Sequence, residues 1–230
     1  MTYVTLTSPD QHTFQAYFAA ASEPDAPGLV LIQEIFGVTP SLCSAADRWA
    51  SLGYNVVVPD LFSRVQAGIQ LDPTVEAEFA RGIQLMQSMN ESLTLGDLET
   101  ARQWLQQKIG HERIASLGFC WGGRLAVGAS VATKMQCHVS YYGVGLEQLI
   151  PMLPSQTAPV LLHIAELDPY VPEAVRGDIL NLAQQHSAWE SFVYAGCDHA
   201  FARPGGVHRN ESAAQLAEER SLAFLKKHTG

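Results

Sequence analysis

The chain has 230 residues, of which 47% are hydrophobic, and a formal net charge of −9 at pH 7. This hydrophobic share is typical of a globular protein with a full apolar core. The negative charge argues against a nucleic-acid surface, which needs clustered Lys and Arg. No uninterrupted apolar stretch approaches the ~20 residues of a membrane span, and the first residues lack the pattern of a signal peptide. We therefore expect a soluble cytoplasmic protein with neither a nucleic-acid nor a membrane partner.

Apolar runs alternate with amphipathic stretches along the chain. The apolar runs predict strands at 2–7, 12–20, 28–32, 55–58, 113–118, 137–142, 160–164 and 190–194. Helical spacing and helix-boundary residues predict helices at 40–52, 74–90, 94–109, 121–133, 173–186 and 211–227. The first two strands are expected to pair antiparallel around a turn, and residues 59–73 are expected to form a loop. The alternation predicts an α/β fold in which helices cover both faces of a mainly parallel sheet, within a single domain over 1–230.

A Gly-x-nucleophile-x-Gly turn follows one of the predicted strands. Gly118-Phe119-Cys120-Trp121-Gly122 comes directly after the apolar run at 113–117. In an α/β-hydrolase this turn presents the nucleophile, usually serine, at a sharp bend between a strand and a helix. A cysteine at a helix N-terminus is favoured as a thiolate, because unpaired N–H groups point toward it. The motif predicts acyl transfer through a thioester on Cys120, and the alternative is an ordinary strand-turn-helix with a buried cysteine.

Two later strand ends carry the partners that a nucleophilic cysteine needs. Asp168 follows the strand at 160–164, and His199 follows the strand at 190–194. The chain order nucleophile, acid, histidine is the order of an α/β-hydrolase triad. His199 would take the thiol proton, and Asp168 would fix the orientation of its ring. Asp198 and Glu166 compete for the acid role. Alternatively, Asp168 is a turn residue before Pro169, and His199 is a surface histidine.

Two of the other three cysteines have a structural interpretation. The four cysteines form no C-x-x-C pair, so neither a zinc knuckle nor a thioredoxin site is indicated, and their scatter favours free thiols. Cys43 and Cys137 lie in apolar elements and are expected to serve packing. The sequence also lacks a P-loop and a zinc-protease motif. We expect no metal and no cofactor.

Several strings spread through nearly the entire chain resemble the dienelactone hydrolase family. They are Gln33–Val38, Pro59–Phe62, Gly96–Glu99, Gly118–Gly123, Tyr141–Gly145 and His199–Arg203. The resemblance implies a monomeric α/β-hydrolase that opens the lactone ring of dienelactone (carboxymethylenebutenolide) to maleylacetate, without metal or cofactor.

The resemblance assigns catalytic roles to Cys120, Asp168 and His199, and adds Glu34 as a fourth catalytic residue. Near Cys120, the Glu34 carboxylate would keep the resting thiol neutral. A substrate carboxylate would disturb that balance, so that Glu34 accepts the thiol proton. The oxyanion would be held by the backbone N–H groups of Trp121, which follows the nucleophile, and of Ile35, from the loop after the strand at 28–32.

Substrate selection depends on cations, because dienelactone carries a carboxylate. Arg203 matches an arginine of the family, four residues beyond the histidine, and would bind that carboxylate. A second family arginine follows a Leu-Asp-Pro string, here Leu71–Pro73, but an ungapped match puts Phe79 at its position. Arg81, two residues on, reaches the pocket only with a small shift of register and is otherwise on a solvated helix face. Phe36, Tyr142 and Trp121 are candidates for an apolar pocket wall.

The sequence therefore predicts a cysteine hydrolase that takes a small lactone or ester. Two alternatives remain at this point. One is a general carboxylesterase that uses the same three residues on small activated esters. The other is a non-catalytic protein of the hydrolase fold in which Cys120 is a redox sensor.

Overall fold

The computed structural model describes residues 2–230, and within them eight strands form one sheet in the order β1-β2-β4-β3-β5-β6-β7-β8. The strands are β1 (Thr2–Thr7), β2 (Thr13–Ala19), β3 (Gly28–Ile32), β4 (Asn55–Pro59), β5 (Ile114–Phe119), β6 (His138–Tyr141), β7 (Val160–Ala165) and β8 (Glu190–Tyr194). Strands β3 to β8 are parallel, whereas β2 pairs antiparallel with both β1 and β4. The predicted antiparallel pair and the mainly parallel sheet are both confirmed.

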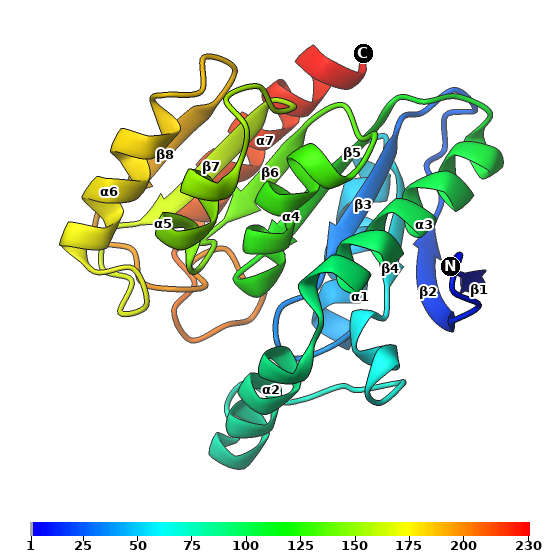
Figure 1. Cartoon of the computed structure of the whole chain (residues 1–230), viewed down its shortest axis with the longest axis horizontal. Helices are drawn as coiled ribbons and strands as arrows, with labels where there is room; N and C mark the ends of the chain where they lie inside the picture. The colour runs from blue at the N-terminus through cyan, green and yellow to red at the C-terminus, as the bar shows by residue number, and fades with distance from the viewer. Residues whose placement is uncertain (1) are drawn as a thin grey trace.

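Helices cover both faces of the sheet, as predicted. They are α1 (Pro40–Ser51), α2 (Glu76–Ser88), α3 (Glu91–Ile109), α4 (Trp121–Ala132), α5 (Leu146–Leu149), α6 (Glu173–Ala183) and α7 (Glu211–Thr229). Figure 1 shows α3, α4, α5 and α6 on the near face, with α1 and α7 behind the sheet. The α2 helix extends beyond one edge of the sheet, where the loop after β8 also lies.

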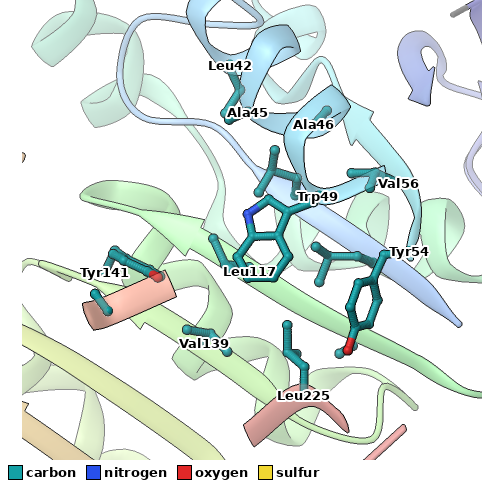
Figure 2. Packing of buried hydrophobic residues seen from close by; sticks show 14 of the residues in the cluster. Leu42, Ala45, Ala46, Trp49, Tyr54, Val56, Leu117, Val139, Tyr141 and Leu225 are labelled. Atoms are coloured by element: carbon teal, nitrogen blue, oxygen red, sulfur yellow. The ribbon is translucent and has the colours of Figure 1, made fainter. Parts of the chain in front are cut away.

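Two large apolar clusters hold these layers together, one on each face. On the face of α1 and α7, Trp49 packs edge-on against Tyr54, and Figure 2 shows it close to Leu117 of the sheet. On the opposite face, α3 and α4 contribute Leu98, Leu105 and Leu125. Strands β3 and β4 are buried along their whole length. Burial on both faces explains why these strands are uninterrupted apolar runs in the sequence.

Three local features differ from the prediction. Helix α3 begins at Glu91 rather than 94, because the Asn90 side chain caps it by accepting a hydrogen bond from the Leu93 N–H at 3.1 Å. A 3₁₀ helix at Leu61–Arg64 interrupts the predicted loop. The short α5 was not predicted, since one helical turn has too few residues to show an apolar period.

The pairing of the parallel strands determines which residues meet at their carboxyl ends. Ile32 at the end of β3 pairs with Gly118 of β5, so the segment after Ile32 lies beside the Cys120 turn. Phe119 pairs with Tyr141, which brings Tyr142 next to the same turn. Strands β7 and β8 then lead into the segments that carry Asp168 and His199. In an open parallel sheet this edge is where ligand-binding residues collect.

None of the helices in the described part of the chain is both long and apolar enough to cross a membrane.

Candidate active site

The Cys120 turn has the predicted strand-turn-helix form. Its backbone lies at φ 55° and ψ −117°, between β5 and the first residue of α4. The Cys120 N–H donates a hydrogen bond to the Tyr141 carbonyl at 3.0 Å, which fixes the turn to β6. A Cβ at Gly118 would lie 2.0 Å from the Gly122 carbonyl oxygen, so only glycine fits there. The turn leaves the Cys120 side chain half-buried rather than sealed in the interior.

Asp168 and His199 form a close pair beside this turn. His199 Nδ1 lies 2.6 Å from Asp168 Oδ2, and both residues are at least nine-tenths buried. Burial opposes a charge on His199. The charge of Cys120 and hydrogen bonds to Asp168 and Cys120 outweigh this effect and raise the pKa of His199 to about 10. An imidazole with this environment can accept a proton from a neighbouring group and hold it.

The two rival carboxylates lie elsewhere in the same loops. Asp198 Oδ1 accepts a hydrogen bond from the backbone N–H of His199 at 2.6 Å, and its other oxygen is 3.0 Å from His208 Nδ1. Glu166 accepts a hydrogen bond from the Gly196 N–H at 2.7 Å. Neither carboxylate is bonded to the His199 ring, so the geometry favours Asp168 for the acid role.

Two tyrosines enclose the His199 ring, and one of them was not expected. The rings of Tyr142 and Tyr170 stand edge-on to His199, with centroids 5.1 and 4.9 Å away. The Tyr170 N–H also donates to Asp168 Oδ1 at 2.9 Å, so this residue contacts both members of the pair. The sequence offered only its position two residues after Asp168, which is a weak signal on its own.

Glu34 is paired with Arg203 rather than with Cys120. The Arg203 Nε and Nη2 lie 2.8 and 2.9 Å from the two Glu34 carboxylate oxygens, a bidentate pair that is largely buried. Burial alone would lower the pKa of Arg203, but the charge of Glu34 more than offsets this and raises it. Both residues lie at the site as expected. In this structure Glu34 and Arg203 are paired with each other. Glu34 is therefore not bonded to the Cys120 thiol, and Arg203 is not free to bind a substrate anion.

The two expected oxyanion donors lie just beyond the ends of two adjacent strands, β3 and β5. Trp121 is the first residue of α4, where a backbone N–H has no partner within the helix. Ile35 follows β3, and within residues 2–230 its amide donates no hydrogen bond. A Cβ at Gly122 would lie 2.5 Å from the Gln33 carbonyl oxygen, so this glycine allows the Cys120 turn to approach the Ile35 loop.

A cavity of about 350 Å³ adjoins these residues. Its lining includes Glu34, Phe36, Leu42, Ala45, Leu71, Phe119, Tyr142 and Arg203. Phe36 and Tyr142 are thus placed at the cavity as expected. The Tyr142 hydroxyl is buried without a hydrogen-bond partner among the described residues, and burial raises the pKa of this tyrosine well above its ordinary value.

Of the two alternatives for Arg81, the structure shows the solvated helix face and not the pocket. Arg81 is exposed, donates a hydrogen bond to Gln66 Oε1, and lies outside the cavity lining. Phe79 instead turns inward, with its ring centroid 5.9 Å from that of Phe36. Residues two positions apart on a helix are about 200° apart around its axis, so Arg81 must point away when Phe79 points in.

Within residues 2–230, no group of three or more His, Cys, Asp or Glu side chains is placed to hold a metal ion. Cys43 is half-buried, Cys137 and Cys197 are buried, and all four cysteines are free thiols. Burial raises the pKa of Cys137 to about 12, which fits the packing role expected for it.

Comparison with known proteins gives consistent sequence matches. The chain matches the family model described as dienelactone hydrolase family over residues 14–229. A protein from Azospirillum brasilense is 38% identical over 240 residues, and the match covers 100% of each chain. The carboxymethylenebutenolidase of Pseudomonas putida is 33% identical over 223 residues, which cover 96% of this chain and 94% of that enzyme.

Solved structures share the fold. A protein from Klebsiella pneumoniae subsp. pneumoniae superposes with a TM-score of 0.82 at 24% identity, covering 99% of this chain and 100% of that one. The dienelactone hydrolase from Anabaena variabilis gives a TM-score of 0.73 at 15% identity, with coverage of 100% and 98%. These likenesses confirm the predicted α/β-hydrolase fold.

Proposed function

The chain belongs to the dienelactone hydrolase family and is a hydrolase of lactone or ester bonds, and from this premise we propose that it opens the ring of dienelactone to maleylacetate through a thioester on Cys120. The observation that carries the proposal is the arrangement of Cys120, His199 and Asp168. The nucleophile stands half-buried on a strained turn, and the histidine is oriented by a buried carboxylate. The pKa of the histidine is raised by the cysteine itself.

The reaction follows from this geometry in two stages. The Cys120 thiolate attacks the lactone carbonyl, and the N–H groups of Ile35 and Trp121 stabilise the oxyanion. The ring C–O bond then breaks, leaving an acyl-thioester on Cys120 and an enolate, which takes the proton held by the His199 imidazolium and becomes the ketone, so that His199 is neutral again. In the second stage neutral His199 removes a proton from water, and the hydroxide cleaves the thioester. Because an enolate leaves easily, little acid catalysis is needed in the first stage.

We further propose that the Glu34–Arg203 pair responds to the substrate carboxylate. An anion that binds Arg203 competes for the guanidinium and releases Glu34, which can then accept the thiol proton of Cys120. Adding a non-reactive carboxylate that resembles the substrate should therefore accelerate alkylation of Cys120 by iodoacetamide. An alkylation rate that stays the same at every pH would contradict this step.

A turnover assay with cis- and trans-dienelactone tests the main proposal. The wild type should consume the lactone, and Cys120→Ala should reduce kcat/KM by at least about 10³-fold, because removing a nucleophile leaves only binding and oxyanion stabilisation. Cys43→Ala is the matched control, since that thiol packs against the core near α1. Full turnover by Cys120→Ala would exclude the thioester route.

A second candidate function is hydrolysis of small activated esters by the same residues. It is favoured by the position of Phe79, because the second arginine expected to bind an anionic substrate is replaced by a ring that packs on Phe36. The ratio of kcat/KM for dienelactone to that for a neutral aryl ester decides between the two. A ratio well above one indicates recognition of the anion by Arg203, and a ratio below one indicates an esterase.

A further inference from the structure

The cavity beside the triad carries little net charge with which to attract an anion. Among the described residues, its charged lining consists of Glu34, Arg203 and Asp72. The first two neutralise each other in a bidentate pair. Asp72 is exposed, and its Oδ1 accepts hydrogen bonds from Thr74. The cavity lining therefore has one cation, Arg203, which already forms an ion pair with Glu34. Its other carboxylate, Asp72, lies at the exposed rim and forms no ion pair with a described residue.

The rest of the wall is mostly apolar and aromatic. It includes Leu42 and Ala45 from α1, Leu71 before α2, Phe36 from the loop after β3, and Phe119 at the end of β5. Phe36 is held from two sides, since Phe79 packs at 5.9 Å and the Arg203 guanidinium lies 5.1 Å from its ring centroid. A volume of about 350 Å³ with such a lining is in the range of small-molecule pockets.

The cavity lies next to the reacting groups, although Cys120 and His199 do not themselves line it. It shares Glu34, Tyr142 and Arg203 with the site, and Phe119 directly precedes Cys120. Tyr142 also contacts the His199 ring. A substituent on a lactone whose carbonyl lies at Cys120 can therefore enter this cavity without leaving the site.

We propose that this cavity binds an apolar arm of the substrate, so that the chain prefers enol lactones with an alkyl or aryl arm over those with a carboxylate arm. This inference rests on the proposed function and specifies its substrate class. Dienelactone is opened with the help of Glu34, but an analogue in which a hydrocarbon chain replaces the carboxymethylene group is opened with a higher kcat/KM, because His199 takes the thiol proton without Glu34 and the buried arm contributes more to binding. The hydrophobic contribution of each buried methylene corresponds to about a fourfold gain.

A homologous series of alkylidene butenolides tests this directly. The ring and the scissile bond stay the same, while the arm grows from one to six carbon atoms, and dienelactone serves as the anionic member. Loss of the lactone absorbance gives kcat/KM, and hydroxide-catalysed opening of each compound corrects for its intrinsic reactivity. The corrected kcat/KM should rise about fourfold per methylene over the first three or four carbons. A flat or falling series overturns the inference.

Phe79→Arg should reverse the preference. An arginine at this inward-facing position of α2 would place a cation against Phe36, which weakens binding of the alkyl arm and strengthens binding of the carboxylate arm. We expect the ratio of kcat/KM for the alkyl arm to that for the carboxylate arm to fall by at least about tenfold, the effect of one well-placed charge contact. Gln84→Arg adds the same charge on an exposed position of the same helix and should leave the ratio unchanged.

The possible outcomes separate this inference from the proposed function. If no member of the series is opened, the proposed function fails and the inference fails with it. If dienelactone is opened but longer alkyl arms bring no gain, only the inference fails. Should Phe79→Arg prove unfolded by circular dichroism, Gln70→Lys places a cation at the exposed mouth of the same cavity. It should lower the ratio in the same direction, and an unchanged ratio would count against the inference.

Discussion

The backbone of Cys120 has a conformation that costs a non-glycine residue about 1–3 kcal/mol, with φ at 55° and ψ at −117°. Its surroundings hold it there. The Cys120 N–H donates a hydrogen bond to the Tyr141 carbonyl of β6. Gly118 and Gly122 let neighbouring backbone segments approach more closely than a Cβ atom would permit. This strained backbone places the Cys120 side chain at the start of α4.

At the residue scale, we expect His199 to titrate at a raised pKa. The pKa of His199 in the folded protein is raised from 6.5 to about 10, and the charge of Cys120 is the largest raising cause. A raised pKa means that the folded chain holds the proton more tightly. The stability gained is fully present below about pH 6.5 and is lost as the pH rises through about 10.

Nuclear magnetic resonance of the imidazole nitrogens measures this pKa. The wild type should titrate well above 6.5, and Cys120→Ala should titrate at clearly lower pH because the thiolate is gone. Cys197→Ala is the control, since it removes a buried thiol from the loop that carries His199, and Cys197 does not contribute to the raised pKa of His199. Equal midpoints in wild type and Cys120→Ala would contradict a close pair between the two residues.

At the scale of elements, α2 contacts both the cavity wall and the loop after β3 that carries Ile35. Phe79 of α2 packs on Phe36, and one turn later Gly82 touches the backbone of Ile35. A Cβ at Gly82 would lie 2.4 Å from the Ile35 carbonyl oxygen, closer than any real contact. The position of the Ile35 amide therefore depends on a glycine in a neighbouring helix.

Gly82→Ala should impair catalysis more than binding. The added methyl group must displace either α2 or the Ile35 loop, and a displacement near 1 Å at a catalytic group can cost about 10²-fold in rate. We expect kcat to fall by at least about tenfold with a smaller change in KM. Gly96→Ala is the matched control, because this helical glycine of α3 has open space around its Cα. It should keep kcat and stabilise the fold by about 0.5–1 kcal/mol. Equal kcat values in the two variants would rule out the contact.

At the scale of the whole molecule, a buried histidine, His163, connects the central sheet to α7. His163 of β7 bonds to the Tyr194 hydroxyl of β8 and to the Ser221 hydroxyl of α7, each at 2.8 Å. Ser221 in turn lies 2.8 Å from the Tyr141 hydroxyl of β6. A second buried histidine, His138, bonds to Ser116 at 2.8 Å. Burial lowers the pKa of both histidines from 6.5 to about 3.

Acid should destabilise the fold through these two rings. Their pKa values are lower in the folded than in the unfolded chain, so unfolding takes up protons as the pH falls. Stability is complete above about pH 6.5 and falls toward pH 3, by about 1.4 kcal/mol per pH unit for each histidine. Urea unfolding between these limits measures the slope. His138→Asn removes one titrating ring and should give a shallower slope than the wild type. Identical slopes would mean that His138 is not buried and neutral.

The predictable parts of the fold and site are those fixed by local pattern. The apolar runs between amphipathic stretches predicted the strands, and the string Gly118-x-Cys120-x-Gly122 predicted the turn after β5. Each of these patterns involves only residues that are close together in the sequence. The strand order, which places β3 between β4 and β5, depends on pairing between distant segments. The Glu34–Arg203 pair and the direction of Arg81 depend on side-chain packing. A two-residue difference on α2 was enough to turn Arg81 away from the cavity.

The most direct test of the account is the covalent state of Cys120 during turnover. His199→Ala should slow hydrolysis of the thioester, so that an enol lactone or activated ester added to this variant leaves an acyl group that intact-protein mass spectrometry detects. Peptide mapping should place the added mass on Cys120, and for a lactone this mass equals that of the intact lactone, because its addition to the thiol loses no atoms. Turnover by the wild type with no adduct on Cys120 in either protein, or an adduct on another residue, would contradict a thioester mechanism at this site.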